Sequence, residues 1–431
     1  GAMPEQSPFS PAPAEPKRPM VPVRPKERIE VIDILRGWAL LGMLFVNMLV
    51  FSGAYRLPDL FTGTTDRVAS GLIEFFAEQK FVSLFSFLFG LGFALQMGRA
   101  EAHGTRFLPR YSRRLLSLLL IGFVNGFLLS TVEALQVYAL LGFLLLLFRA
   151  WSPRAILIVA FICVLIPIGR EAVDLKLHQF RLANPQAAEE IRQEDAEREA
   201  AWRAQGEERL RIYSKGTYGE MVVYRARFWN RVYFSLDFYP SWLGQEFVMF
   251  LLGLYVGRRR IFENLSVHLP FIRKIRWWVL GLGLLCTAVS YAMSQLANPA
   301  LPYLTRPLGR LLWAVGAPAL SFFYASILIV LAQGQVWKPR LYPLAAAGRM
   351  ALTNYLLQSV ICTTIFYSYG LGLYGQVGPA AGVPLTVLIF VTQIMLSIWW
   401  LRHFRFGPAE WLWRTLTYGK LQPMRVSQPA A

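Results

Sequence analysis

Long apolar runs separated by short polar connections fill most of this chain. The first run covers Val31 to Ser52, and the others cover 81–98, 115–150, 155–168, 239–257, 276–294, 311–333, 343–367 and 381–401. The run over 115–150 is too long for one helix, and Ser130 to Glu133 divides it into two. Since a span needs roughly 20 apolar residues, the pattern predicts an all-α transmembrane helical bundle of about ten spans.

Charge divides the chain into five predicted parts. Residues 1–28, rich in Pro and Ala and ending in basic residues, form a disordered cytosolic tail. A first transmembrane bundle covers 29–170, and a second covers 235–405. Between them, 171–234 is a strongly charged helical insertion outside the membrane. The segment 406–431 is an amphipathic tail with tryptophans, typical of the membrane interface.

Composition supports this class and fixes an orientation. The chain is 55% hydrophobic and only 16% charged, with a mean hydropathy of +0.40 and a net charge of +18. Lys and Arg gather at the ends of apolar runs, which predicts cytoplasmic termini and membrane-lipid partners rather than nucleic acid. The three cysteines lie far apart in apolar runs, so we expect no metal site.

Polar residues within the first and third spans are the first candidates for a site. Asp33 and Arg36 share a helix face and can pair; a helix-start cap with a basic anchor is the alternative interpretation. Asn47 lies in the outer half of the same helix, as a ligand contact or as a helix–helix bond. Asn125 and Glu133 mark the third span and the connection after it. An intramembrane carboxylate is costly without a partner, which favours a functional role for Glu133.

A second polar group opens the late span at AAAGRMALTNYLLQS, over 345–359. Arg349 begins this span, and Asn354 and Gln358 lie one turn apart on one face, with Tyr355 beside them. Such a stripe can bind a carbonyl or phosphate, or hold another helix. We expect it to share a pocket with Arg36 and Glu133.

Several of these segments resemble the YeiB-like family of bacterial inner-membrane proteins. The matching stretches are IDILRGWALLGMLFVN, FVSLFSFLFGLGFAL, RRLLSLLLIG, YALLGFLLLL, GRMALTNYLLQS, FYSYGLGLYGQ and LRHFRFGPAEWLWRTLTYG. The latter half is similar to that family's domain of unknown function. The first helix also resembles that of transmembrane acyltransferases, namely the heparan-alpha-glucosaminide acetyltransferases and the acyltransferase-three proteins. The resemblance implies a multi-pass protein of the bacterial inner membrane.

The resemblance further implies a chemistry. Acyl-CoA, for instance acetyl-CoA, would be the donor and no cofactor would be tightly bound; the acceptor would be a periplasmic glycan or a lipid-linked group. Asn47 falls where the acyltransferase-three proteins carry a catalytic histidine. Asn125 and Glu133 stand where YeiB-like proteins usually carry His and Asp, and only the glutamate can act as a base. In this interpretation Arg36 and Arg349 hold the donor, while Asp33, Asn47, Asn125, Asn354, Tyr355 and Gln358 complete the site.

Two other functions remain open on the sequence. A transporter or lipid-handling protein could use the same polar cavity without covalent chemistry, as the missing histidine favours. A scaffold protein could use the charged insertion to bind a partner. The sequence leaves the acceptor, the acyl group and a homodimer undecided.

Overall fold

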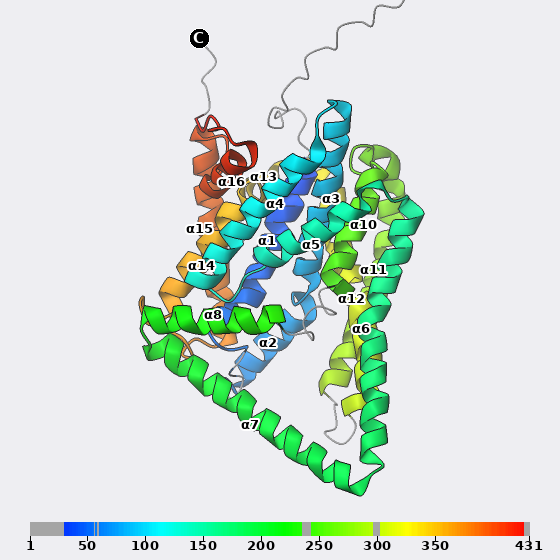
Figure 1. The fold of residues 1–431 in the computed structure, drawn as a ribbon. Helices are drawn as coiled ribbons and strands as arrows, with labels where there is room; N and C mark the ends of the chain where they lie inside the picture. The colour runs from blue at the N-terminus through cyan, green and yellow to red at the C-terminus, as the bar shows by residue number, and fades with distance from the viewer. Residues whose placement is uncertain (1–29, 56, 58–59, 235–242, 296–301, 426–431) are drawn as a thin grey trace, which may run out of the picture.

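The computed structural model describes residues 30–425 except 56, 58–59, 235–242 and 296–301. The predicted tail over 1–28, the start of the span at 239 and the last six residues therefore lie outside the described residues. Most of the described residues are helical, which confirms the predicted all-α bundle (Figure 1). The helices in order are α1 Glu30–Phe51, α2 Thr64–Phe76, α3 Lys80–Ala102, α4 Phe107–Val124, η3 Asn125–Leu129, α5 Leu135–Leu145, η4 Leu146–Ala150, α6 Pro153–Leu182, α7 Pro185–Lys215, α8 Tyr218–Phe234, η5 Leu243–Phe247, α10 Val248–Arg258, α11 Leu265–Gln295, α12 Pro302–Ala332, α13 Trp337–Arg349, α14 Ala351–Phe366, α15 Pro379–His403 and α16 Pro408–Tyr418.

Seven helical stretches of the described chain are long and apolar enough to cross a membrane, and Leu135–Ala150 and Ala351–Phe366 are shorter apolar helices. The count of about ten spans stays a prediction. Two boundaries predicted from the sequence differ from those in the structure. The single span expected over 343–367 is divided at Met350, where φ is −109° and ψ is 35°, into α13 and α14. The boundary drawn at residue 170 falls inside α6, which continues to Leu182.

The two predicted bundles share one core. Buried Leu35 of α1 and Leu84 of α3 belong to the same apolar cluster as Met249 of α10, Ala325 of α12 and Leu341 of α13. Burial of such side chains is the main apolar contribution to the fold, although packing rather than water exclusion dominates within lipid. The halves before and after the insertion therefore form one bundle.

Helices α1 and α13 cross in direct backbone contact. A Cβ atom added at Gly37 would lie 2.0 Å from the Leu344 carbonyl oxygen, and one added at Gly348 would lie 1.8 Å from the Asp33 oxygen. No side chain fits at either place, so glycine is required on both helices. This contact fixes the first turn of α1, with Asp33 and Arg36, beside the start of α14.

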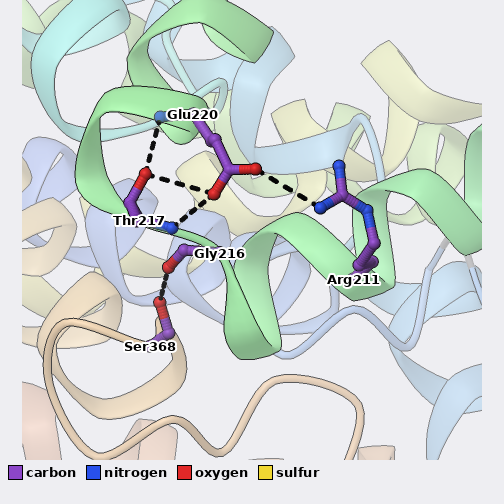
Figure 2. Close-up of polar contacts among 5 residues, drawn as sticks. All are labelled: Arg211, Gly216, Thr217, Glu220 and Ser368. Carbon is purple, nitrogen blue, oxygen red and sulfur yellow. Dashed lines mark hydrogen bonds and ion pairs between the residues drawn. The ribbon is translucent and has the colours of Figure 1, made fainter.

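The insertion forms α7 and α8 at the end of the bundle opposite α16 (Figure 1). Helix α8 begins with a capping box, in which the Glu220 carboxylate accepts hydrogen bonds from Thr217 N at 2.7 Å and Thr217 Oγ1 at 3.1 Å. Glu220 N donates in return to Thr217 Oγ1 at 3.3 Å, and Arg211 pairs with Glu220 at 3.3 Å (Figure 2). The sequence T-Y-G-E thus turns the chain from α7 into α8.

The same corner is tied to the loop between α14 and α15. Ser368 Oγ donates to the Gly216 carbonyl oxygen, as Figure 2 shows, and Ser368 N donates to the Tyr213 oxygen at 2.8 Å. Buried Tyr213 and Tyr367 stack beside these bonds, with ring centroids 4.2 Å apart. The insertion is therefore docked on the bundle rather than hanging free of it.

Candidate functional site: a basic cavity within the bundle

A cavity of about 160 Å³ opens between α1, α3, α4, α5, the α13–α14 junction and α16. Four arginines from four helices line it, namely Arg36, Arg114, Arg349 and Arg414. Among the lining residues that the structure describes, Glu410 is the only acid. A cavity with this excess of guanidinium groups favours an anionic ligand, above all one with phosphates, which arginine binds through paired N–H donors.

The arginines are held by neighbours and act on one another. Arg36 Nη1 lies 3.2 Å from the Asp33 carboxylate. The charges of Arg36 and Arg414 both act on the Arg114 guanidinium, which lies 3.6 Å from the ring centre of Trp413. Trp413 Nε1 in turn donates to the Arg114 carbonyl oxygen at 2.8 Å. Docking of α16 on α4 thus brings separate positive charges to one place.

Glu410 of α16 serves the helix that starts beside the cavity. Its carboxylate accepts hydrogen bonds from Leu352 N at 2.6 Å, Thr353 N at 3.1 Å and Thr353 Oγ1 at 2.5 Å. It therefore caps the first turn of α14. Burial raises the pKa of Glu410 above its usual value, while these hydrogen bonds act in the opposite direction. The four guanidinium groups outnumber this single carboxylate in the lining, so the cavity keeps its attraction for an external anion.

Tyr355 and the link after η3 form the deep wall of the cavity. Tyr355 Oη accepts a hydrogen bond from Ala134 N at 3.0 Å and donates to the Val132 oxygen at 3.1 Å. Ala134 and Tyr355 both line the cavity, while Glu133 lies directly behind them. Glu133 is 9% exposed, and its carboxylate accepts hydrogen bonds from Asn125 Nδ2 and Leu135 N.

Helix α8 covers the other side of this link. Arg225, fully buried, donates to three successive carbonyl oxygens at the end of η3: Phe127 at 2.9 Å, Leu128 at 2.9 Å and Leu129 at 3.0 Å. Trp229 Nε1 donates to the Gly126 oxygen at 3.1 Å. These bonds satisfy carbonyls that a helix leaves open at its end. Asn125, which begins η3, is thereby fixed against Glu133.

The structure brings together part of the predicted site. Arg36, Arg349 and Tyr355 line the cavity, Asp33 pairs with Arg36, and Glu133 and Asn125 lie together behind its wall. Asn47 is half-buried and does not line the cavity. The roles given to these residues stay predictions.

Asn354 and Gln358 face away from the cavity into the contact with α15. Asn354 Nδ2 donates to Ser397 Oγ at 3.0 Å, and Gln358 Nε2 donates to Gln393 Oε1 at 3.0 Å. Gln393 Nε2 also donates to the backbone carbonyl oxygen of Asn354 at 2.8 Å. The expected shared pocket therefore does not include them, because Gln393 and Ser397 of α15 take up their amide N–H groups in a helix–helix contact.

Sequence reasoning missed Arg114, Arg414 and Glu410. The two arginines carry the same pattern as the basic anchors at the ends of apolar runs, and Glu410 is an ordinary acid in the first turn of a short helix. Only the docking of α16 on α4 and α14 separates them from such anchors.

An all-helical bundle of apolar helices that encloses a charged cavity defines a polytopic membrane protein. Residues 28–187 match the family described as heparan-alpha-glucosaminide N-acetyltransferase, catalytic, and residues 256–420 match a protein family of unknown function, DUF418. The uncharacterized protein YxaH of Bacillus subtilis (strain 168) is 36% identical over 94% of this chain and 97% of its own length. The uncharacterized protein YeiB of Escherichia coli (strain K12) is 28% identical over 94% of this chain and 98% of its own length. The chain belongs to this YeiB-like family, as its motifs predict.

Proposed function

We propose that this protein transfers an acyl group from acyl-CoA to a hydroxyl or amine on a periplasmic or lipid-linked acceptor. The observation that carries the proposal is the convergence of four arginines on one cavity. These side chains suit the phosphates of coenzyme A, and the apolar depth of the cavity suits the pantetheine arm and a short acyl group. The match of residues 28–187 to an acetyltransferase catalytic family supports the same chemistry.

In the proposed reaction Glu133 accepts the acceptor's proton as its oxygen or nitrogen attacks the thioester carbonyl. The new bond forms to the acyl carbon, the carbon–sulfur bond breaks, and the leaving thiolate takes the proton back from Glu133, so that coenzyme A leaves as the thiol and the carboxylate is restored. Asn125 orients the carboxylate. For this step the hydrogen bond between Ala134 N and Tyr355 Oη would have to open, so that Glu133 reaches the cavity. The protein would act in the bacterial inner membrane with both termini cytoplasmic, so that the basic cavity receives a cytosolic donor.

Purified protein in nanodiscs with labelled acetyl-CoA tests this function. Arg414→Gln is expected to weaken acetyl-CoA binding at least tenfold, because it removes one charge-assisted partner worth about 1.5–3 kcal/mol. Glu133→Gln is expected to retain binding and lose release of coenzyme A. Arg227→Gln, on the exposed side of α8, is the matched control. Equal binding by wild type and Arg414→Gln would refute the donor site.

One observation favours a second function, a carrier that binds an anion without covalent chemistry. Both Glu133 oxygens already accept hydrogen bonds, one of them from the first turn of α5. If Glu133 is only structural, we expect anion flux in proteoliposomes. Arg414→Gln should reduce this flux, and Glu133→Gln should leave it unchanged. Release of coenzyme A that depends on Glu133 separates the two functions.

A further inference from the structure

A second cavity lies at the end of the bundle that carries α7. It has a volume of about 460 Å³, larger than the basic cavity, and is bounded by α2, the start of α3, α6, α11 and α12. None of its lining residues lines the basic cavity. A volume in this range suits a small molecule or a lipid headgroup.

One wall holds two acids and a buried ammonium group. Glu74 and Glu78 act on each other electrostatically, and both act on Lys80. Lys80 is 2% exposed, and its Nζ donates to the backbone oxygen of Glu74 at 3.0 Å, which uses one of its three N–H groups. The half-buried Glu74 carboxylate makes no hydrogen bond or ion pair with any residue that the structure describes. A polar group so placed within an apolar bundle calls for a partner.

A second pair of opposite charges lines the same cavity. Arg310 of α12 lies 3.6 Å from the Glu171 carboxylate of α6. Helix α11 adds hydroxyl groups to the lining, and Tyr291 packs edge-on against Phe75 with ring centroids 6.1 Å apart. The cavity therefore offers carboxylates, cationic donors and aromatic faces within one enclosure. A simple anion would meet three acids, and a simple cation would meet Lys80 and Arg310.

We propose that this cavity binds a small zwitterion that carries a primary ammonium and a phosphate or carboxylate group. The ammonium is held by Glu74 and Glu78, and the anionic group by Lys80 and Arg310. A molecule with both signs can meet the acids and the cationic groups at once, whereas either half alone meets only one of the two kinds of group. The same chemistry occurs in a free amino-alkyl phosphate and in an ethanolamine lipid headgroup. The inference does not depend on acyl transfer.

Isothermal titration and thermal unfolding of the full chain in phosphatidylglycerol nanodiscs test it with O-phosphoethanolamine. Ethanolamine and inorganic phosphate serve as the two half-probes. Saturable binding at least tenfold tighter than that of either half is the expected result. Glu74→Gln, which breaks no ion pair among the described residues, is expected to weaken binding at least tenfold. Glu199→Gln, on the exposed face of α7, is the matched control and keeps full binding.

A second arm distinguishes the source of the zwitterion. If the lipid headgroup is the ligand, phosphatidylethanolamine nanodiscs should raise the unfolding temperature of wild type but not that of Glu74→Gln. O-phosphoethanolamine should then no longer bind, because the site is already occupied. Binding that persists there assigns it to the free molecule. Ser294→Trp at the exposed rim blocks either ligand and removes no charged group. The proposal fails if no arm shows saturable binding, if the half-probes bind as well, or if Glu74→Gln and Ser294→Trp both bind as wild type.

Discussion

Arg225 shows how a single charged side chain can complete a helix end inside a protein. It fills the space beneath η3 and replaces the next helical turn with three N–H donors. Burying a guanidinium is costly, so the side chain is useful only while the carbonyl oxygens accept its protons. The Asn125–Glu133 pair stands directly on this support.

Arg225→Met is therefore expected to lower the free energy of unfolding by several kcal/mol. The Leu128 oxygen keeps its bond from Tyr218 Oη at 2.8 Å, but those of Phe127 and Leu129 lose the Arg225 donor, at about 1–3 kcal/mol for each unsatisfied group. Unfolding in mixed micelles with increasing dodecyl sulfate measures the change. Arg227→Met, two residues away and exposed, should behave as wild type. Equal losses in both variants would show that Arg225 has no special role.

Glu220 gives a prediction for pH. The hydrogen bonds from Thr217, followed by the contact with Arg211, lower the pKa of this exposed carboxyl below its usual 4.5. A carboxyl group whose pKa is lowered by folding stabilises the fold at any pH above its pKa in the unfolded state. This contribution is lost as the pH falls through its pKa in the folded state. Wild type should thus exceed Glu220→Gln in unfolding temperature at pH 7, and the difference should shrink steadily towards pH 3. A constant difference across this range would contradict the capping box.

At the scale of elements, run length and periodicity predict the helices well, because a membrane leaves the backbone few other structures. The division at Met350 escapes prediction, since no proline interrupts the run there. It depends on partners far away in sequence: α1 against Gly348 and the Glu410 cap from α16. Arg114 and Arg414 likewise reach the cavity only through the docking of α16 on α4, so the sequence singles out Arg36 and Arg349 but not these two.

The crossing of α1 and α13 can be tested by adding one methyl group. Gly37→Ala places a Cβ against the Leu344 backbone, so the helices must separate, at a cost of roughly 1–3 kcal/mol. Gly348→Ala should behave alike. Gly98→Ala on α3 meets nothing within 4 Å and should be neutral or slightly stabilising, as helix propensity predicts. The free energies of unfolding of all three variants, measured in the same micelles, give the difference. Equal values for the three would contradict a close crossing of α1 and α13.

At the scale of the molecule, the insertion and α16 cover opposite ends of one bundle (Figure 1). The proposed orientation places α7 and α8 outside the cytoplasm and α16 inside. Because Cys163, Cys286 and Cys362 are all buried, a thiol probe meets little background.

A membrane-impermeant maleimide tests this orientation. Glu199→Cys on α7 should react in intact spheroplasts. Glu101→Cys, exposed at the end of α3, should react only after the membrane is made permeable. The reverse labelling would show the opposite orientation in the membrane. It would then exclude a cytosolic donor for the basic cavity.

The Asp33–Arg36 pair also bears on how the protein is made. Helix α1 leaves the ribosome long before α13, the partner that will lie against Gly37, has been translated. During that interval the opposite charges of Asp33 and Arg36 lie one turn apart and can pair with each other. The newly synthesised helix therefore depends less on another counter-ion when it inserts into the membrane. The pair that lies beside the basic cavity in the folded bundle would thus first assist the membrane insertion of the leading helix.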